Sequence, residues 1–474
     1  MTTETNTAVA AALEHLRQNQ DRHLHELDEF LRIESVSADP TKAGEVRHAA
    51  QWIMLELATI GFEHVALHET SGHPIVTADW LHAGPHRPTV LVYCHYDVQP
   101  PDPLAEWVRP PFDPRHEEGR VYARGVGDDK GQIFIHLKAA EAWMASAGRL
   151  PVNLRIFFEG DEEVGSESAD EFIGEHPELL AADLCVVSDT GMQDDDGTPA
   201  ITYGLRGIAY FEVRVSGPFQ DLHSGGYGGA IANPARVLVE MLAGLQDEHG
   251  RITIPGFYDK VRPLTDADRA ASAAVPFDEE EFREQTGVPR LWSGEEGYTY
   301  AERISARPTL DINGIWGGYS GEGAKTIIPA WAAAKFSARL VPDQDFHEIE
   351  RLVVDHLRRI APPEVKLDVR IIHGGAPALT PLDHPAVAVA ARALEAAFGK
   401  APVFLRSGGS IPVVAALMAH VGLSSVLVGF ASPNGNFHAP NEWMPVANLS
   451  GGMEAVVHLW GELGEMTADQ LRSG

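Results

Sequence analysis

Histidine and carboxylate residues follow several apolar segments of this sequence, at the points where the segments end. His95 follows TVLVYC, and Asp189 follows LCVVS. Glu162 and Glu163 come soon after NLRIFF, and His438 lies beyond SVLVGF. In open α/β sheets, ligands bind beyond the carboxyl ends of the strands. If the apolar segments are strands of one sheet, the sequence predicts that these side chains gather at one edge of it.

Two imidazoles and at least three carboxylates suit a pair of divalent metal ions. Imidazole together with oxygen donors fits zinc, manganese or cobalt better than calcium or magnesium, and zinc is our first choice. Two such ions lie about 3.5–4 Å apart and can hold a hydroxide between them. A carboxylate that is not itself a ligand can move the proton of that water, so Glu162 and Glu163 can supply one base and one ligand. Asp97 can orient the His95 ring through its far nitrogen.

Each of these residues has a simpler explanation when it is taken alone. A single histidine at a strand end is usually a hydrogen-bonded loop residue, and an acidic run can be a solvated turn. Asp129 could cap the helix that follows it. The loop Gly125-Val126-Gly127 could bind a phosphate group, but the two aspartates after it would repel one. Because several independent segments end in the same residue types, a shared metal site is the favoured interpretation.

The segments that must position these residues alternate between strand-like and helix-like patterns. We expect strands at 89–94, 153–158, 184–187 and 425–430, and helices at 8–33, 43–60, 129–147, 384–398 and 446–463. The helix at 43–60 should end at Gly61, a residue type that often terminates helices. Continuously apolar strands between helices are typical of an α/β layer whose sheet is covered on both faces.

The middle of the chain follows a different pattern. It begins with the alternating strand IAYFEVRVSG and continues with a helix at 233–245 and an irregular, Pro- and charge-rich stretch at about 250–308. Strands and one more helix complete this α+β region. We therefore expect residues 1–206 and 381–474 to form a catalytic, metal-binding α/β domain, with residues 207–380 inserted as a second domain.

Composition excludes several classes of partner. The net charge of −31 repels nucleic-acid phosphates and anionic membranes, so we expect neither as a partner. No apolar run approaches the roughly 20 residues that a membrane helix needs. The N-terminus lacks the basic-then-apolar layout of a signal peptide, so we expect a cytoplasmic protein. Cys94 and Cys185 lie in apolar strand-like runs and are expected to be small core residues.

Seven segments resemble the carnosinase and cytosolic nonspecific dipeptidase branch of the dinuclear metallopeptidases, whose relatives include aminoacylases and succinyl-diaminopimelate desuccinylases. The segments, which follow the family order, are CHYDVQP (94–100), GRVYARGVGDDKG (119–131), FFEGDEEVGS (157–166), SDT (188–190), DLHSGGYGG (221–229), RSGGSIP (406–412) and FHAPNE (437–442). The resemblance implies a zinc-aminopeptidase-like catalytic domain with a mixed, mostly parallel sheet, an inserted lid and dimerisation domain, and hydrolysis of dipeptides.

The resemblance also implies roles for individual residues. His95 and Asp189 would hold one metal ion, and Glu163 and His438 the other. Asp128 would bridge the two ions, with a cis peptide bond between Asp128 and Asp129. The remaining roles fall to Glu162 as the general base and Asp97 as the brace on His95.

Further resemblances concern the substrate. His223 matches a family histidine that reaches the active site of the partner subunit in a homodimer. The residues that match positions gripping the C-terminal end of the substrate are Arg339, Thr326, His373 and Ser410. One departure is Ser407, where relatives commonly carry a glutamate, so any substrate preference that rests on that acidic side chain does not transfer.

Three alternatives remain. The same machinery could act on N-acyl amino acids or remove C-terminal residues from longer peptides. A catalytically silent binding module is a third possibility, but the general base and all five metal ligands are present. The favoured hypothesis is a metal-dependent dipeptidase.

Overall fold

The chain forms two units in the computed structural model, which describes residues 1–292 and 294–472. The first unit comprises Met1–Tyr203, Thr380–Leu405 and the chain from Pro412 onward. The second comprises Gly204–Leu379 and Arg406–Ile411. The substrate segment RSGGSIP thus lies almost entirely in the second unit, although it is far along the chain from the rest of that unit.

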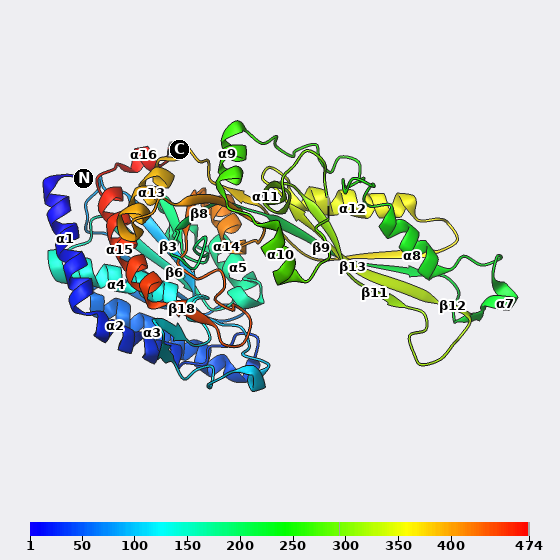
Figure 1. The fold of residues 1–474 in the computed structure, drawn as a ribbon, viewed down its shortest axis with the longest axis horizontal. Coiled ribbons are helices and arrows are strands. Elements are labelled where there is room, and N and C mark those ends of the chain that lie inside the picture. The colour runs from blue at the N-terminus through cyan, green and yellow to red at the C-terminus, as the bar shows by residue number, and fades with distance from the viewer. Residues whose placement is uncertain (293, 473–474) are drawn as a thin grey trace. The chain divides into compact units, whose positions relative to one another are not determined.

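The first unit is built on a mixed sheet (Figure 1). Its strands run in the spatial order β1 (Glu63–His68), β2 (Ile75–Trp80), β6 (Asn153–Glu159), β3 (Thr89–His95), β7 (Leu184–Val187), β17 (Ser425–Val428) and β8 (Ala200–Leu205). The four central strands, β6-β3-β7-β17, pair in parallel, and the outer strands pair antiparallel. The central strands are the continuously apolar segments of the sequence, as expected for a covered sheet.

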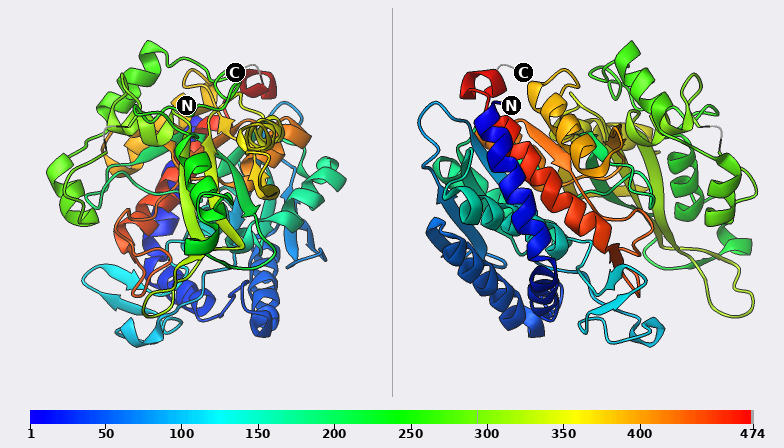
Figure 2. Two further views of the ribbon diagram at one scale, coloured as in Figure 1. Left: turned by 90° about the vertical axis from the view of Figure 1, so that its right-hand side faces the viewer. Right: turned by 60° about the vertical axis from the view of Figure 1, so that its left-hand side comes forward.

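Helices from both ends of the chain pack together in the first unit. They are α1 (Thr3–Gln18), α2 (Gln20–Leu31), α3 (Ala43–Ile60), α4 (Lys130–Ala147), α13 (Pro385–Phe398) and α15 (Val446–Leu463). Shorter ones are α5 (Glu167–Glu175), α6 (Pro177–Leu180), α14 (Pro412–Ala416) and α16 (Ala468–Arg472). Figure 2 shows α1 (blue) beside α15 (red), so the first and last long helices of the chain share one core. Among the described helices, none is both long and apolar enough to cross a membrane.

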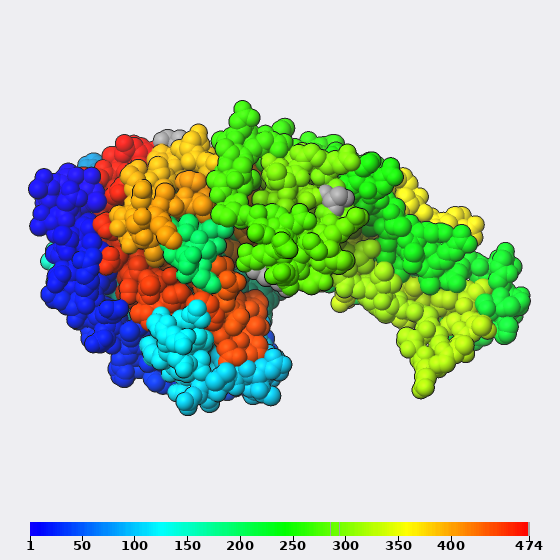
Figure 3. All heavy atoms as spheres, in the orientation of Figure 1, coloured from blue at the N-terminus to red at the C-terminus, as the bar shows by residue number. Residues whose placement is uncertain are grey.

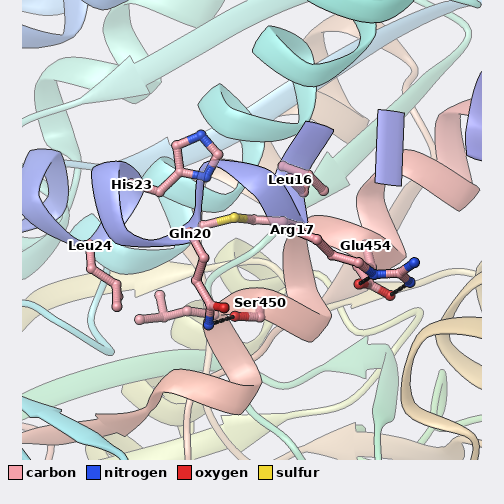
Figure 4. Close-up of a pocket in the computed structure, with 9 residues that line it drawn as sticks. Leu16, Arg17, Gln20, His23, Leu24, Ser450 and Glu454 are labelled. Carbon is pink, nitrogen blue, oxygen red and sulfur yellow. Dashed lines mark hydrogen bonds and ion pairs between the residues drawn. The ribbon is translucent and has the colours of Figure 1, made fainter. Parts of the chain in front are cut away.

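The helix expected over residues 8–33 is two helices. The break lies at Asn19, whose backbone N–H and side-chain amide both bond the carbonyl of His15. A short amide side chain competes with the helix ladder in this way, which explains the interruption. A cavity of about 130 Å³ opens beside the break, between α1, α2 and α15. Figure 4 shows Arg17 paired with Glu454 at its rim, and Gln20 bonded to Ser450.

The second unit has its own four-stranded antiparallel sheet. Its order is β11 (Thr309–Gly317), β13 (Trp331–Leu340), β9 (Gly207–Ser216) and β14 (Lys366–Gly375). One face packs against α8 (Pro234–Ala243) and α12 (Phe346–Ile360), through Phe211 of β9 and Phe336 of β13 among others. Because side chains alternate along a strand, the opposite face carries the half-buried polar residues Tyr210, Ser337 and Arg339.

The stretch from 250 to 308 was expected to be irregular, and that prediction is wrong in part. It contains α9 (Asp266–Ala274), α10 (Glu279–Thr286) and α11 (Tyr300–Ser305). Thr265 with Asp268 and Thr299 with Glu302 form reciprocal capping boxes at two of these helices. These caps satisfy backbone groups that very short helices would otherwise leave exposed.

Small ladders complete the fold. The second unit contains β10 (Leu222–His223) paired with β12 (Ile327–Ile328), and the one-turn helix α7 (Ser224–Tyr227). The first unit contains a small sheet of β4 (Arg115–Glu117), β5 (Arg120–Tyr122) and β18 (Trp443–Pro445). The short strands β15 (Ala378–Leu379) and β16 (Val403–Ser407) both pair with β8. Gly61 ends α3 in the left-handed conformation, as expected.

Candidate metal centre

Two groups of ligand atoms gather at the carboxyl ends of the parallel strands. In the first group, atoms of His95, Asp128 and Asp189 lie within 4.8 Å of one another. Nε2 of His95 is 3.0 Å from Oδ1 of Asp128 and 3.8 Å from Oδ1 of Asp189. His95 ends β3 and Asp189 follows its parallel neighbour β7, so the pairing of these strands explains the approach.

The second group consists of Asp128, Glu163 and His438. Nε2 of His438 is 3.0 Å from Oδ2 of Asp128 and 3.3 Å from Oε2 of Glu163. Asp128 therefore offers one oxygen to each group. A carboxylate that bridges two metal ions needs this arrangement.

The turn before α4 positions the shared carboxylate. The peptide bond between Asp128 and Asp129 is cis. Asp129 stands at the N-cap of α4 but makes no capping hydrogen bond with its side chain. Its Oδ2 instead accepts the backbone N–H of His95 at 3.2 Å. The capping interpretation of Asp129 is thus wrong, and the residue connects the turn to β3.

Asp97 contacts both the first imidazole and the acidic turn. Its carboxylate lies 3.3 Å from Nδ1 of His95, so the opposite ring nitrogen faces Asp128. The same carboxylate accepts the backbone N–H groups of Glu162 at 3.2 Å and Glu163 at 3.1 Å. One buried side chain thereby fixes the ring of His95 and the backbone of the Glu162–Glu163 pair.

The two adjacent glutamates have different surroundings. Gln99 donates to Oε2 of Glu163 at 2.7 Å, which directs this carboxylate toward the second group. The carboxylate of Glu162 has no hydrogen-bond partner within the part of the chain that the structure describes. Burial raises the pKa of Glu162 above its ordinary value. A half-buried carboxylate that no described side chain engages, and whose pKa is raised, suits a group that accepts a proton and releases it again.

The charges of the centre call for cations. Burial and the charge of Asp128 raise the pKa of Glu163 to about 8, and burial and the charge of Glu162 raise the pKa of Asp189 well above its usual range. Burial also acts to raise the pKa of Asp128, but hydrogen bonds from His438 and His95 hold that pKa below its ordinary value. Metal ions would favour the ionised carboxylates. The nitrogen and oxygen donors present therefore fit a pair of divalent ions of the zinc, manganese or cobalt type.

Sequence reasoning gave no role to Gln99 or to Glu442, and Glu442 makes the larger set of contacts. Glu442 is fully buried, and its Oε2 accepts Nη1 of Arg124 at 2.7 Å and the backbone N–H of Gly125 at 2.8 Å. Its Oε1 accepts the backbone N–H groups of Gly127 at 2.9 Å and Asp128 at 3.2 Å. The glycine-rich loop thus binds an internal carboxylate, which removes the argument for a phosphate site. The signals in the sequence were the segment FHAPNE (437–442), which ends in Glu442, and a glycine-rich loop that needed an acceptor.

The loop that carries His438 is held by the segment after β3. Asn441 accepts the backbone N–H of Val108 and donates to the carbonyl of Glu106, both at 2.8 Å. Figure 3 shows these two parts of the chain, cyan and orange-red, packed side by side on the surface of the first unit. His438 has a positive φ of 59°, a region that few residues other than glycine adopt, and the contacts of Asn441 brace the loop around it.

The expected substrate residues of the second unit form two separate groups. Nη1 of Arg339 lies 3.5 Å from Oγ of Ser410, and His373 packs its ring edgewise against Tyr210. These residues lie toward the Leu340 end of the sheet, where β13 pairs with the start of β9.

His223 and Thr326 lie at the other end. His223 is exposed, its Nδ1 accepts the N–H of Gly225 at 3.0 Å, and it pairs with the residue after Thr326. Strand β13 separates this group from Arg339. From Trp331 to Arg339 it spans about 26 Å, at roughly 3.3 Å per residue. One chain therefore keeps His223 far from Arg339.

Comparisons with known proteins agree with this arrangement. A model of peptidase family M20/M25/M40 matches residues 91–462. The Cys-Gly metallodipeptidase DUG1 of Candida albicans is 32% identical, over 94% of this chain and 96% of its own length. The Beta-Ala-His dipeptidase of Homo sapiens is 32% identical, over 90% of this chain and 86% of its own length.

Solved structures share the fold. The M20 family metallo-carboxypeptidase Sso-CP2 from Sulfolobus solfataricus has a TM-score of 0.82 and 30% identity, covering 94% of this chain and 99% of that one. The expected mixed α/β fold with a parallel centre is confirmed. The family model spans most of the chain, and the relatives match over nearly their whole lengths. The chain belongs to peptidase family M20/M25/M40 and is a hydrolase of peptide bonds.

Proposed function

We propose that this protein is a dipeptidase that works with two bound divalent metal ions, zinc in the first place and manganese or cobalt as alternatives. The observation that carries the proposal is the sharing of Asp128 between two groups of ligand atoms. His95 and Asp189 complete one metal site, and Glu163 and His438 complete the other. The names of the similar proteins, a Cys-Gly metallodipeptidase and a Beta-Ala-His dipeptidase, support dipeptides as substrates.

The side chains around the metal sites have separate tasks. When bound, the ions would supply Lewis-acid chemistry, which acidifies water and polarises the scissile carbonyl. Glu162 takes the proton from the attacking water and delivers it to the leaving amine. Asp97 keeps this carboxylate in position, because it binds the backbone of Glu162 and the ring of His95.

Residues of the second unit bind the C-terminal end of the dipeptide. Arg339 binds the terminal carboxylate, since a guanidinium can donate two parallel hydrogen bonds to it. Two observations support this role: among the described residues Arg339 has no carboxylate within 4 Å, and Ser410 lies beside it. Thr326 and His373 are the other two residues that we assign to this end of the substrate.

The enzyme acts as a homodimer, in which His223 of one chain stabilises the developing oxyanion in the other. The separation along β13 supports this arrangement, because a single dipeptide cannot contact both His223 and Arg339 of one chain. The edge strand β11 exposes Ile312, Ile315 and Trp316, with 45%, 55% and 39% of their surfaces accessible. An apolar sheet edge of this kind suits a second copy of the chain, so the inserted region 207–380 would serve as lid and dimer surface.

The protein would act in the cytoplasm. Its two cysteines, Cys94 and Cys185, are free and buried, which suits a reducing compartment.

A panel of related substrates tests the proposed activity. The panel contains Ala-Ala, Ala-Ala-Ala, acetyl-Ala and acetyl-Ala-Ala, each assayed with the metal-loaded enzyme. We expect the highest kcat/KM for Ala-Ala. Acetyl-Ala as the best substrate would identify an N-acyl-amino-acid amidohydrolase instead. Acetyl-Ala-Ala as the best substrate would identify a carboxypeptidase, the alternative that the similarity to Sso-CP2 favours. The Glu162→Gln variant at equal metal content is the control for contaminating peptidases.

A further inference from the structure

Two guanidinium groups flank one loop on the polar face of the second unit's sheet. Arg339 on β13 donates from Nη1 to Ser410. Arg206, immediately before β9, donates from Nε to the carbonyl of Gly408 at 3.1 Å and from Nη1 to Oγ1 of Thr309 at 3.3 Å. Thr309 is the cross-strand partner of Arg339. Both guanidiniums therefore border the loop 408–410 and share Thr309 as a neighbour.

Among the residues that the structure describes, neither arginine has a carboxylate partner. Within the described residues, no acidic oxygen lies within 4 Å of Arg206 or Arg339, and the loop Ser407–Ile411 contains no acidic residue. The exposed Asp311 has no ion pair with either arginine among the described residues and acts on both only through its charge. Burial and repulsion from Arg339 lower the pKa of Arg206 to about 10. Partly buried like charges without a partner are costly, so this pair favours an anion between or beside them.

A cavity of about 290 Å³ lies next to Arg206, within the second unit. Its walls include Arg206, Arg303, Ile304, Thr309 and Leu310. A liquid water molecule occupies about 30 Å³, so the cavity has room for an amino-acid side chain.

The cavity is positively charged in a protein whose net charge is −31. Its Arg307 is neutralised by Glu295 at 2.7 Å, but Arg303 has no carboxylate within 4 Å among the described residues. Among the described wall residues, the two arginines without an ion-pair partner, Arg206 and Arg303, outnumber Asp311, the one acidic residue without such a partner. The walls combine this excess charge with the apolar surfaces of Ile304 and Leu310, which suits a side chain with a short aliphatic stem and an anionic head.

We propose that Arg206 and this cavity form a subsite for the acidic side chain of the substrate's C-terminal residue, while Arg339 binds the terminal carboxylate. The enzyme therefore prefers dipeptides that end in glutamate or aspartate. The inference rests on the proposed dipeptidase function and names its substrate class. Two carboxylates on one residue match two guanidiniums that share one loop.

The test compares an acid with its neutral isostere. Calorimetric titration of the metal-loaded enzyme with glutamate and with glutamine measures binding without turnover. Kinetics with Ala-Glu and Ala-Gln measure the same difference during hydrolysis. The variants are Arg206→Gln, which removes the charge, and Arg206→Lys, which keeps it. Arg214→Gln is the matched control, because Arg214 lies on the same β9 strand but stacks on Trp331, away from the loop.

For the wild type we expect glutamate to bind about 10-fold or more tightly than glutamine, since its carboxylate accepts a charge-assisted hydrogen bond that the neutral amide cannot replace. Ala-Glu should exceed Ala-Gln by a similar factor in kcat/KM, through KM. Arg206→Gln should abolish both preferences, with a much smaller loss for Ala-Gln than for Ala-Glu. Arg206→Lys should keep part of them, and Arg214→Gln should keep them fully.

Two results would overturn the inference. Equal binding of glutamate and glutamine by the wild type would do so without any variant. Equal losses for both substrates in Arg206→Gln would mean that Arg206 only supports the loop 408–410 or shares the terminal carboxylate. Failure of the proposed function has a different signature, because then neither dipeptide is hydrolysed while the titration still reports on the subsite.

Discussion

Glu442 accepts the backbone N–H of Asp128 at 3.2 Å, so a residue outside the ligand set holds the backbone of the residue whose carboxylate both metal groups share. The same side chain is paired with the buried Arg124 at 2.7 Å. Arg124 and Glu442 are far apart in the chain, and their ion pair connects the two segments of the first unit that flank the candidate metal centre.

Replacing Glu442 should weaken both stability and metal binding. Glu442→Ala leaves the charge of Arg124 buried and unpaired, which typically costs about 3–5 kcal/mol. Glu442→Gln keeps the volume, yet it loses the charge that orients the loop, so we expect metal affinity to fall about 10–100-fold. Urea unfolding and metal titration measure the two effects. Glu117→Gln, a change at an exposed residue of β4 in the same unit, is the control, and equal behaviour of the 442 and 117 variants would refute this role.

Replacing the unengaged carboxylate should separate catalysis from metal binding. Glu162→Gln should retain two metal ions per chain but lower kcat by about 10²-fold or more, because the amide cannot accept a proton. Metal content by mass spectrometry and initial rates on Ala-Ala give both quantities. Glu167→Gln, on the exposed face of the next helix, should leave kcat unchanged. Unchanged turnover in Glu162→Gln would assign the base to another residue.

Mixing two inactive variants should restore activity if the active site is shared. His223→Ala supplies an intact Glu162, and Glu162→Gln supplies an intact His223. A mixed dimer then contains one complete site, so we expect about half of the wild-type turnover per dimer. Differently tagged chains allow the mixed species to be purified and assayed. If confirmed mixed dimers stay inactive, His223 acts within its own chain or not at all.

Stability should decline below pH 6.5 because of one buried histidine. His136 is fully buried against Ser188, and burial lowers its pKa to about 3. Below pH 6.5 His136 binds a proton in the unfolded chain but stays neutral in the folded chain. Stability is therefore lost as the pH falls from 6.5 toward 3. Between pH 7 and 5 the loss is about 2 kcal/mol. The wild type should therefore lose about that much more than His136→Gln in urea unfolding, and parallel pH profiles would contradict the prediction.

Local sequence patterns predicted what local physics determines. The apolar runs marked the central strands, and parallel pairing then brought the residues after them to one edge, so His95 and Asp189 could be placed together in advance. The helix end at Gly61 followed from the backbone freedom of glycine. The capping boxes at Thr265 and Thr299 have a recognisable sequence pattern, but the surrounding proline and charged residues led to the prediction of an irregular stretch.

Other features depend on long-range contacts and could not be predicted. Glu442 looked like an ordinary loop residue, since its role appears only when the loop at Gly125 folds against it. The break at Asn19 lies in a continuous apolar pattern, and it coincides with the backbone and side-chain hydrogen bonds that Asn19 donates to the carbonyl of His15. No sequence motif marks Arg206, because its proximity to Arg339 arises only when β9 and β13 pair.

The most direct test of the account is anomalous scattering from crystals of the zinc-loaded protein. We expect two peaks about 3.5–4 Å apart on either side of Asp128. One should lie against His95 and Asp189, and the other against Glu163 and His438. A single peak, or two peaks that do not share Asp128, would contradict the two-metal centre and the chemistry that depends on it.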